Sequence, residues 1–306
     1  MTPEYNNDTA AFERRIIAEF RANEGRMSGM FEGVTLCVLT TVGAKTGLRR
    51  EKPLGYLDID GTAVVVASSG GADRDPGWYH NILATPMVTV ETGTDTYRAI
   101  AAPAVGAERD RLFAAVVEHS PGFAGYQAAT ERVIPMVTLR RIGDDGAERL
   151  RGLGDFLAEG HDWLRGELTR VRARLTAVID GEQAMPGQAV SESAPTLARQ
   201  LRTHCLDFCG ALHQHHEGED RGAFPMLADR YPELAPVLTR LGEEHRVVGK
   251  LRERIESLVP AEGAADPVRL RDELDRLADE LERHFAYEER TIVEALNTLG
   301  PAPNIP

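Results

Sequence analysis

The feature that most constrains this chain is a change of hydrophobic period near Gly143–Gly146, in the sequence GDDG. Before it, short runs rich in β-branched residues alternate with turn signals, which predicts strands. After it, apolar residues recur with a helical period and no strand pattern is present. With 306 residues, the chain is also long enough for two domains. We therefore predict a multidomain α+β protein with domains at 1–142 and 153–306 and a linker at 143–152.

The first half has the pattern of an antiparallel sheet or a small barrel. An amphipathic helix is expected first, in DTAAFERRIIAEFRAN, with Asp8 or Thr9 as its cap. A second helix is expected near 107–118. The predicted strands lie at 34–42, 62–69, 87–93, 96–105 and 135–142.

The second half predicts four helices with the connections of an up-down bundle. Pro195 and Pro267 are expected in first helical turns, where proline is tolerated. A polar linker is expected at 181–194. The predicted helices lie at 153–180, 195–217, 233–258 and 267–299.

Composition argues against several classes of protein. A net charge of −13 disfavours binding to nucleic acid or to anionic lipid. No apolar stretch approaches the ~20 residues that cross a bilayer, and the first residues lack the order of a signal peptide. A cytoplasmic location is therefore expected, with Cys205 and Cys209 as buried, reduced thiols. The sequence leaves the oligomeric state open.

Histidines gather in the second half, with at least one on each predicted helix. Two of them precede a glutamate by four residues, which places each pair on one helical face. One such pair would suit a solvated surface, but two pairs together with further histidines favour a metal site. Imidazoles and carboxylates that meet inside a bundle suit a pair of iron ions. The candidate ligands are His161, His215, Glu219, His245, His284 and Glu288.

Four other ionisable residues lie near these candidates. We predict His204 and His213 to be surface or packing histidines, because they do not share the face of the candidate ligands. His216 and Asp220 lie one step around the helix. We expect them to contact the ligands rather than the metal.

The segments GHDWLR, HHEGEDRGAFP, EEHRVVGKLRERI and HFAYEERTIVEAL together resemble the hemerythrin-like HHE cation-binding family over 153–299. The resemblance implies a di-iron site held by the six candidate ligands. Oxygen-carrying members have a further histidine one turn after the third-helix ligand, and this chain has Gly249 there. The resemblance thus implies sensing of O2, NO or peroxide, or redox chemistry, at least as much as oxygen storage. Manganese and zinc remain alternatives for these ligands.

Two loops in the first half predict a cofactor site. TTVGAKTGLRREKPLGYL (40–57) places glycines around Lys45 and just before two arginines. Such a loop suits an anion because backbone amides can approach oxyanions closely, although a solvated hairpin would also explain it. SSGGADRDPGWYHN (68–81) adds glycines and aromatics, which fits a cofactor with phosphate and a flat ring. The alternative is a long turn with packing aromatics.

These loops, with FRANEGRMSGMFEG and PGFAGYQAATERVIPMVTL, resemble the deazaflavin-dependent nitroreductase family over about 12–140. Members are split β-barrel oxidoreductases, similar to FMN-binding folds, with flanking helices and coenzyme F420. The resemblance implies Tyr126 as a substrate-side proton donor. Ser69 stands where members often have lysine, and FMN remains an alternative cofactor. The implied cofactor-binding residues are Lys45, Thr46, Gly47, Arg50, Pro53, Ser68, Gly70, Gly71, Trp78 and Tyr79.

The two resemblances imply one function. An F420-dependent oxidoreductase would transfer a hydride to an electron-poor quinone or nitroaromatic, with a tyrosine that stays protonated at neutral pH as proton donor. The attached di-iron domain would bind or sense O2, NO or peroxide. A hydride carrier delivers single electrons to iron poorly, so we expect independent sites or regulation of one by the other. The alternative is a non-catalytic gas or redox sensor whose barrel only binds a cofactor or lipid.

Overall fold

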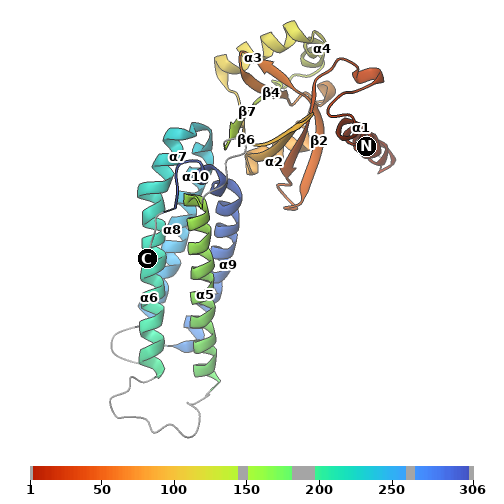
Figure 1. Ribbon diagram of the computed structural model, residues 1–306. Coiled ribbons are helices and arrows are strands. Elements are labelled where there is room, and N and C mark those ends of the chain that lie inside the picture. Colours follow the sequence, from red (N-terminus) through yellow and green to blue (C-terminus); the bar gives the residue numbers. More distant parts are fainter. Residues whose placement is uncertain (1–2, 144–150, 181–196, 260–265, 303–306) are drawn as a thin grey trace. The chain divides into compact units, whose positions relative to one another are not determined.

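The computed structural model describes residues 3–143, 151–180, 197–259 and 266–302. The chain divides into two compact units, Met1–Asp145 and Gly146–Pro306, which are described separately. The predicted multidomain α+β class is confirmed, with strands and helices in the first unit and a helical second unit (Figure 1). Most of the predicted linker at 143–152, all of the polar linker at 181–194 and Pro195 lie outside the described residues.

A seven-stranded antiparallel sheet, in the order β2-β1-β5-β6-β7-β4-β3, forms the described part of the first unit's centre. The sheet curls until β2 contacts β4, which confirms the barrel-like architecture (Figure 1). The strands are β1 (Leu36–Val42), β2 (Arg49–Gly55), β3 (Leu57–Ile59), β4 (Thr62–Val66), β5 (Met87–Thr92), β6 (Asp95–Pro103) and β7 (Met136–Ile142).

Helices cover both faces of this sheet, because alternate strand residues point to opposite faces. On β4, Val65 joins the core under α2, whereas Val64 and Val66 join the core under α3. α1 packs its own apolar side against β1. The helices of this unit are α1 (Pro3–Ala22), α2 (Gly77–Ala84), α3 (Gly106–His119) and α4 (Gly122–Ala128), with short 3-10 turns at Gly29–Phe31 and Ser69–Gly71.

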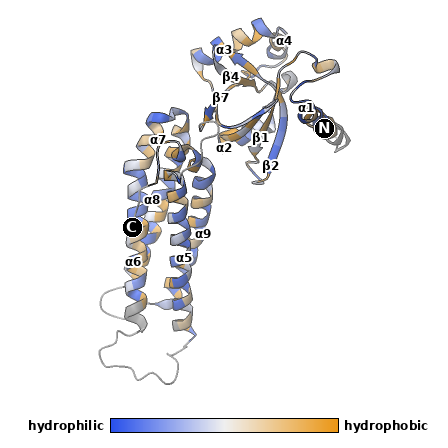
Figure 2. Cartoon of the chain, viewed as in Figure 1, coloured by the Kyte–Doolittle hydropathy of each residue, from blue (hydrophilic) through white to orange (hydrophobic). Residues whose placement is uncertain are grey.

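Two details of the first half were predicted wrongly. α1 begins at Pro3, so Asp8 and Thr9 lie within the helix and do not cap it. Proline suits a first helical turn, and no helix breaker separates it from Asp8. The strands β2 and β3 were not predicted. Figure 2 shows β2 to be largely hydrophilic, since an edge strand buries little side-chain surface and needs no apolar alternation.

Four long helices form the described part of the second unit, as predicted (Figure 1). α5 packs against α6 and α9, and α8 packs against α6 and α9. Pro267 opens α9, and the Asp266 carboxylate accepts hydrogen bonds from the amides of Val268 and Arg269, both at 3.1 Å. The elements are α5 (Leu153–Ile179), α6 (Leu197–Gly218), a π-helix (Glu219–Ala223), α7 (Phe224–Arg230), a 3-10 turn (Pro232–Leu234), α8 (Ala235–Leu258), α9 (Pro267–Thr291) and α10 (Val293–Asn297).

The ends of two predicted helices differ from the structure. The second helix does not stop at 217, because the chain continues through the π-helix directly into α7. The fourth ends at Thr291 and is followed by the separate α10. Among the described residues, no helix combines the length and the apolar character that crossing a bilayer requires.

The cysteines provide a first testable prediction. Cys37, Cys205 and Cys209 are free and fully buried, and burial raises the pKa of Cys205 to about 11 and of the other two to about 12. The thiolate is the reactive form, so we expect no alkylation by iodoacetamide at pH 8 in the native chain. Mass spectrometry should show three labels after denaturation. A label acquired by the native chain within minutes would contradict this burial.

A second prediction concerns the close approach of α5 and α10. A Cβ at Gly154 would lie 2.0 Å from the carbonyl oxygen of Val293, so a side chain there forces the backbone apart. We expect Gly154→Ala to lower the free energy of unfolding of the helical unit by about 1–3 kcal/mol. The matched control is Gly166→Ala on the same helix, where the nearest atom would be 3.8 Å away on the Arg170 guanidinium.

In the control, replacing a helical glycine should stabilise the unit by about 0.5–1 kcal/mol. Denaturant titrations followed by circular dichroism at 222 nm measure both effects. Equal stability of the two variants would show that α5 and α10 do not approach each other closely at Gly154.

Candidate metal centre and candidate cofactor pocket

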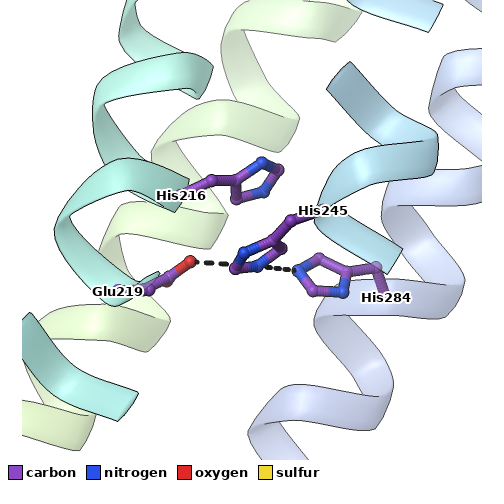
Figure 3. A group of neighbouring side chains, drawn as sticks. All are labelled: His216, Glu219, His245 and His284. Carbon is purple, nitrogen blue, oxygen red and sulfur yellow. Dashed lines mark hydrogen bonds and ion pairs between the residues drawn. The ribbon is translucent and has the colours of Figure 1, made fainter. Parts of the chain in front are cut away.

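Side chains from α5, α6, α8 and α9 converge in the interior of the helical unit. All six predicted ligands are buried except His215, whose side chain is 17% exposed. In the part of the chain that the structure describes, two groups have candidate ligand atoms within 4.8 Å of one another. One group is His161, His215 and Glu219, and the other, shown in Figure 3, is His216, Glu219, His245 and His284.

Two buried carboxylates lie between histidines of the two groups. Glu219 Oε1 is 2.9 Å from His215 Nε2, and its Oε2 is 3.3 Å from His245 Nε2. Glu288 Oε2 is 3.4 Å from His161 Nε2 and 3.3 Å from His284 Nε2. Each carboxylate thus faces a histidine of both groups. In this arrangement each carboxylate could bridge two cations.

Three of the histidines are oriented by carboxylates outside the cluster. Because a carboxylate only accepts, each of these histidines donates its Nδ1–H and directs its Nε2 inward. The pairs are His161 Nδ1 with Glu289 at 2.9 Å, His245 Nδ1 with Asp220 at 2.9 Å, and His284 Nδ1 with Glu244 at 3.0 Å. Glu244 and Glu289 were not predicted from the sequence. The only signal for them there is that each is adjacent to a candidate ligand.

The π-helix positions one wall of the cluster. It begins at Glu219, and the additional residue that a π turn introduces rotates everything after it relative to α6. The ring of Phe224, just beyond the π-helix, stacks on His245 at 5.4 Å between centroids and 18° between planes. The sequence pattern of 217–225 indicated only a break, because a π turn has no recognisable periodicity of its own.

The electrostatics of the cluster call for positive charge. Burial disfavours the charged imidazole, but the nearby carboxylates of Glu219, Glu288 and Glu289 outweigh it and raise the pKa of His161 to about 10. Burial likewise opposes the charged form of His284, whereas Glu244 and Glu288 raise its pKa to about 9. The buried Glu288 has a lowered pKa, since its contacts with these two histidines outweigh its burial. Without a metal, protons supply the charge that the carboxylates need.

The residues fit bound cations. Several buried polar atoms have no hydrogen bond of acceptable geometry, a costly state unless a ligand meets them. His245 Nε2 and His284 Nε2 also lie only 3.2 Å apart, where two lone pairs would repel without a proton or cation. Imidazole and carboxylate donors together suit iron, manganese or zinc. The unpartnered atoms at the cluster are the Nε2 of His161, His215 and His216 and both carboxylate oxygens of Glu219 and Glu288.

In the first unit, the loop between β1 and β2 forms one side of a cavity. The amide of Gly47, whose φ is +65°, donates to Gly43 O at 2.8 Å and tightens the hairpin tip. The amide of Ala44 donates to Asn81 Oδ1 at 3.0 Å, and Asn81 Nδ2 donates to Thr41 Oγ1 at 2.9 Å. Asn81, which is not among the predicted site residues, therefore fixes the loop to α2.

The cavity beside this loop has a volume of about 720 Å³. That is a typical size for a small-molecule or cofactor site. Two of its charged residues are paired, Lys52 with Glu13 and Glu51 with Arg21. Lys45 and Arg50 are exposed and have no ion-pair partner among the described residues, which leaves the cavity suited to an anionic ligand. Its lining residues are Gly43, Ala44, Lys45, Thr46, Arg50, Glu51, Lys52, Pro76, Gly77, Trp78, His80 and Asn81.

The second predicted loop lines this cavity with its later residues, Pro76, Gly77, Trp78, His80 and Asn81, whereas its first part packs against α4 and Arg132. Gly71, with φ +79°, lies so close to α4 that a Cβ there would be 3.0 Å from Tyr126 O. Arg132 holds the loop by donating to Ser68 O at 2.6 Å and pairing with Asp75 at 2.7 Å. Tyr126 is 41% exposed, with Phe123 edge-on to it at 5.7 Å.

Comparison with known proteins assigns each unit to a family. Residues 12–141 match the model of the F420H(2)-dependent quinone reductases, and residues 153–296 match the hemerythrin HHE cation binding domain. An F420H(2)-dependent quinone reductase of Mycobacterium tuberculosis strain H37Rv is 36% identical over 128 residues, covering 40% of this chain and 86% of the relative. A solved F420-H2 dependent reductase (FDR-A) shows 36% identity and a TM-score of 0.33, covering 35% of this chain and 94% of that one.

The chain belongs to the F420H(2)-dependent quinone reductase family. Its second unit is a hemerythrin HHE domain. Both resemblances inferred from the sequence are thereby confirmed.

Within the quinone reductase domain, the predicted cofactor residues fall into separate places. Lys45, Thr46, Arg50 and Trp78 line the 720 Å³ cavity. Gly47 shapes the adjoining hairpin, and Pro53 lies on β2. Gly70 and Gly71 belong to the 3-10 turn that follows Ser68, and Tyr79 lines a different cavity of about 370 Å³. Their role in holding a cofactor stays a prediction.

Within the hemerythrin domain, the six predicted ligands come together, and their role as ligands stays a prediction. His213 is exposed and His204 pairs with Glu167 at 2.7 Å, as expected for residues outside the cluster. Asp220 contacts His245, as expected. His216 differs from its predicted place, because it lies inside one ligand group instead of behind it.

Proposed function

We propose that the quinone reductase domain binds reduced coenzyme F420 in the 720 Å³ cavity and transfers a hydride to a quinone or nitroaromatic. The observation that carries the proposal is the pair of unpartnered cations, Lys45 and Arg50, at a cavity of cofactor size in a domain of this family. The cofactor supplies the hydride, and the protein binds it, orients it and excludes water. Tyr126 is proposed to donate a proton to the acceptor.

Cofactor titration with a turnover assay tests this proposal. F420 should quench the protein's fluorescence at lower concentration than FMN, and reduced F420 should be oxidised only when menadione is added. Tighter binding of FMN would make the domain a flavin protein. Binding of F420 without menadione-dependent oxidation would favour the alternative of a non-catalytic cofactor-binding domain.

We propose that the hemerythrin domain holds two iron ions and binds or senses O2, NO or peroxide. The support is the pair of carboxylates that each face both ligand groups, with three histidines oriented from outside by carboxylates. Metal analysis should give about two irons per chain, and the visible absorption of the ferric protein should change when one of these small molecules is added. Zinc in place of iron, or an unchanged spectrum, would contradict the proposal.

We further propose that the two sites work independently or that one regulates the other. A deazaflavin transfers electrons in pairs as hydride, whereas iron ions accept them singly. Stopped-flow mixing of reduced F420 with the ferric protein measures the rate at which the iron is reduced. This rate should not exceed the background rate, which is measured with the cofactor cavity of the quinone reductase domain blocked. Faster reduction would establish electron transfer between the sites.

A further inference from the structure

We propose that His216 is a direct metal ligand, which supplies a third imidazole nitrogen to one of the two cation positions. It would take the place of the α8 histidine that is absent at Gly249. The inference rests on the proposed binding of two cations. With His216 as a ligand, the two cation positions are chemically different, because one has three histidines and the other has two.

The geometry of α6 allows one turn to serve both groups. His215 and His216 are consecutive and point about 100° apart around the helix. Glu219 lies four residues after the first and three after the second, so it is one turn away from both. His215 thus joins His161, His216 joins His245 and His284, and Glu219 lies between the groups.

The surroundings of His216 are those of a ligand rather than of a packing residue. The residue is 6% exposed, and its Nε2 is buried with no hydrogen-bond partner among the described residues. Its ring stacks on His245 at 4.1 Å between centroids and lies 5.3 Å from His284. Figure 3 shows the four side chains of this group directed into the same interior space, with His216 beside the ring of His245.

Two other histidines on α6 provide a comparison. His213 is exposed to solvent, and His204 has a carboxylate partner in Glu167. His204 Nδ1 is also buried without a hydrogen-bond partner, but among the described residues neither His204 nor His213 belongs to a group of candidate ligand atoms. Only the position of His216 on the helix, and not its residue type, distinguishes it from these two.

The position of Gly249 explains why α6 supplies this nitrogen. Gly249 lies one turn after His245 on α8, where a further histidine would point toward the same cation. A Cβ at Gly249 would meet nothing within 4 Å, and the residue lines a cavity of about 250 Å³ together with His216 and His245. The space that a histidine at position 249 would fill is therefore open. His216 lies on the other side of this space, on α6, and joins His245 and His284 from there.

Cobalt titration of the metal-free full-length protein tests the inference. Co²⁺ reports its ligands through visible absorption, and equilibrium dialysis gives the number bound. In His216→Phe the ring can still stack on His245 but offers no nitrogen. We expect this variant to keep one cation and to bind the second at least about tenfold more weakly, the lower limit for removal of even an outer contact. The control is His213→Phe, the same change at an exposed position three residues earlier, which should bind two cations like the wild type.

A rescue variant and a direct spectrum complete the test. In His216→Phe/Gly249→His, the α8 histidine should restore the second cation. If His216→Phe does not fold, as judged by circular dichroism, wild-type protein loaded with Co²⁺ still decides. Its proton NMR spectrum should show five hyperfine-shifted, exchangeable imidazole N–H signals when His216 is a ligand and four when it is not.

The outcomes separate the two proposals. If His216→Phe binds two Co²⁺ ions with wild-type affinity, or only four imidazole signals appear, His216 is not a ligand, and the cation site stands without it. If wild-type protein binds no Co²⁺, the proposed metal centre itself is wrong.

Discussion

Glu219→Gln is expected to reduce the metal content of the protein from about two ions per chain to below one. Glu219 is the residue common to both ligand groups, with one oxygen 2.9 Å from His215 Nε2 and the other 3.3 Å from His245 Nε2. Glutamine keeps the shape but has one oxygen and no charge. One of the two proposed cations therefore loses its ligand at this position, the other keeps only a neutral amide oxygen, and the negative charge of the buried pair Glu219 and Glu288 is halved.

The same substitution should change how stability depends on metal. A ligand that binds only the folded state stabilises it by about 2.7 kcal/mol at a hundredfold excess over its dissociation constant. A chelator should thus lower the melting temperature of the wild-type hemerythrin domain by several degrees and leave that of Glu219→Gln nearly unchanged.

The matched control is Glu243→Gln, which makes the same change at an exposed position on α8. Elemental analysis of the three proteins, purified side by side, should show two ions per chain in the wild type and the control. If Glu219→Gln still holds two ions tightly, this carboxylate does not bridge them.

Removal of Lys45 and Arg50 together is expected to weaken F420 binding by about a hundredfold or more. Both are exposed at the 720 Å³ cavity and have no ion-pair partner among the described residues. A hydrogen bond to a charged group contributes about 1.5–3 kcal/mol, or roughly tenfold to a hundredfold in affinity for each residue. The single substitutions Lys45→Ala and Arg50→Ala should each show part of the loss.

The kinetic pattern should distinguish binding from chemistry. If these cations hold the anionic part of the cofactor, KM for F420 should rise while kcat at saturation stays within a few fold. Binding to the wild type should weaken with added salt, and the double variant should show a smaller salt dependence. Lys250→Ala, which removes an exposed lysine from the hemerythrin domain, is the control and should match the wild type. An unchanged KM in the double variant would place the cofactor elsewhere.

Much of the fold follows from local pattern. The long helices carry an apolar stripe, so their ranges and the start of α9 at Pro267 could be predicted closely. The buried strands could be predicted because they are rich in β-branched residues. β2 could not, since an edge strand is defined by its backbone bonds to β1, and its sequence, RREKPLG, begins with charged residues and has no fully buried side chain.

The same division applies to the metal centre. The spacing of His215 and Glu219, and of His284 and Glu288, predicted two candidate pairs because helical neighbours are fixed by the backbone. His216 could not be assigned in this way. Its neighbours, His245 and His284, lie on other helices, and the empty position at Gly249 matters only because of what α6 places across from it.

The sequence by itself determined the two families, the order of most elements and the residue types that can hold a metal or a cofactor. These depend on short-range periodicity and on motifs that each occupy one segment. Only the tertiary structure decided which carboxylates face both histidine groups, which parts of the two loops line the 720 Å³ cavity, and that His216 belongs to the cluster. Those relations join residues far apart in the chain, and the packing of helices and the curl of a sheet set their distances.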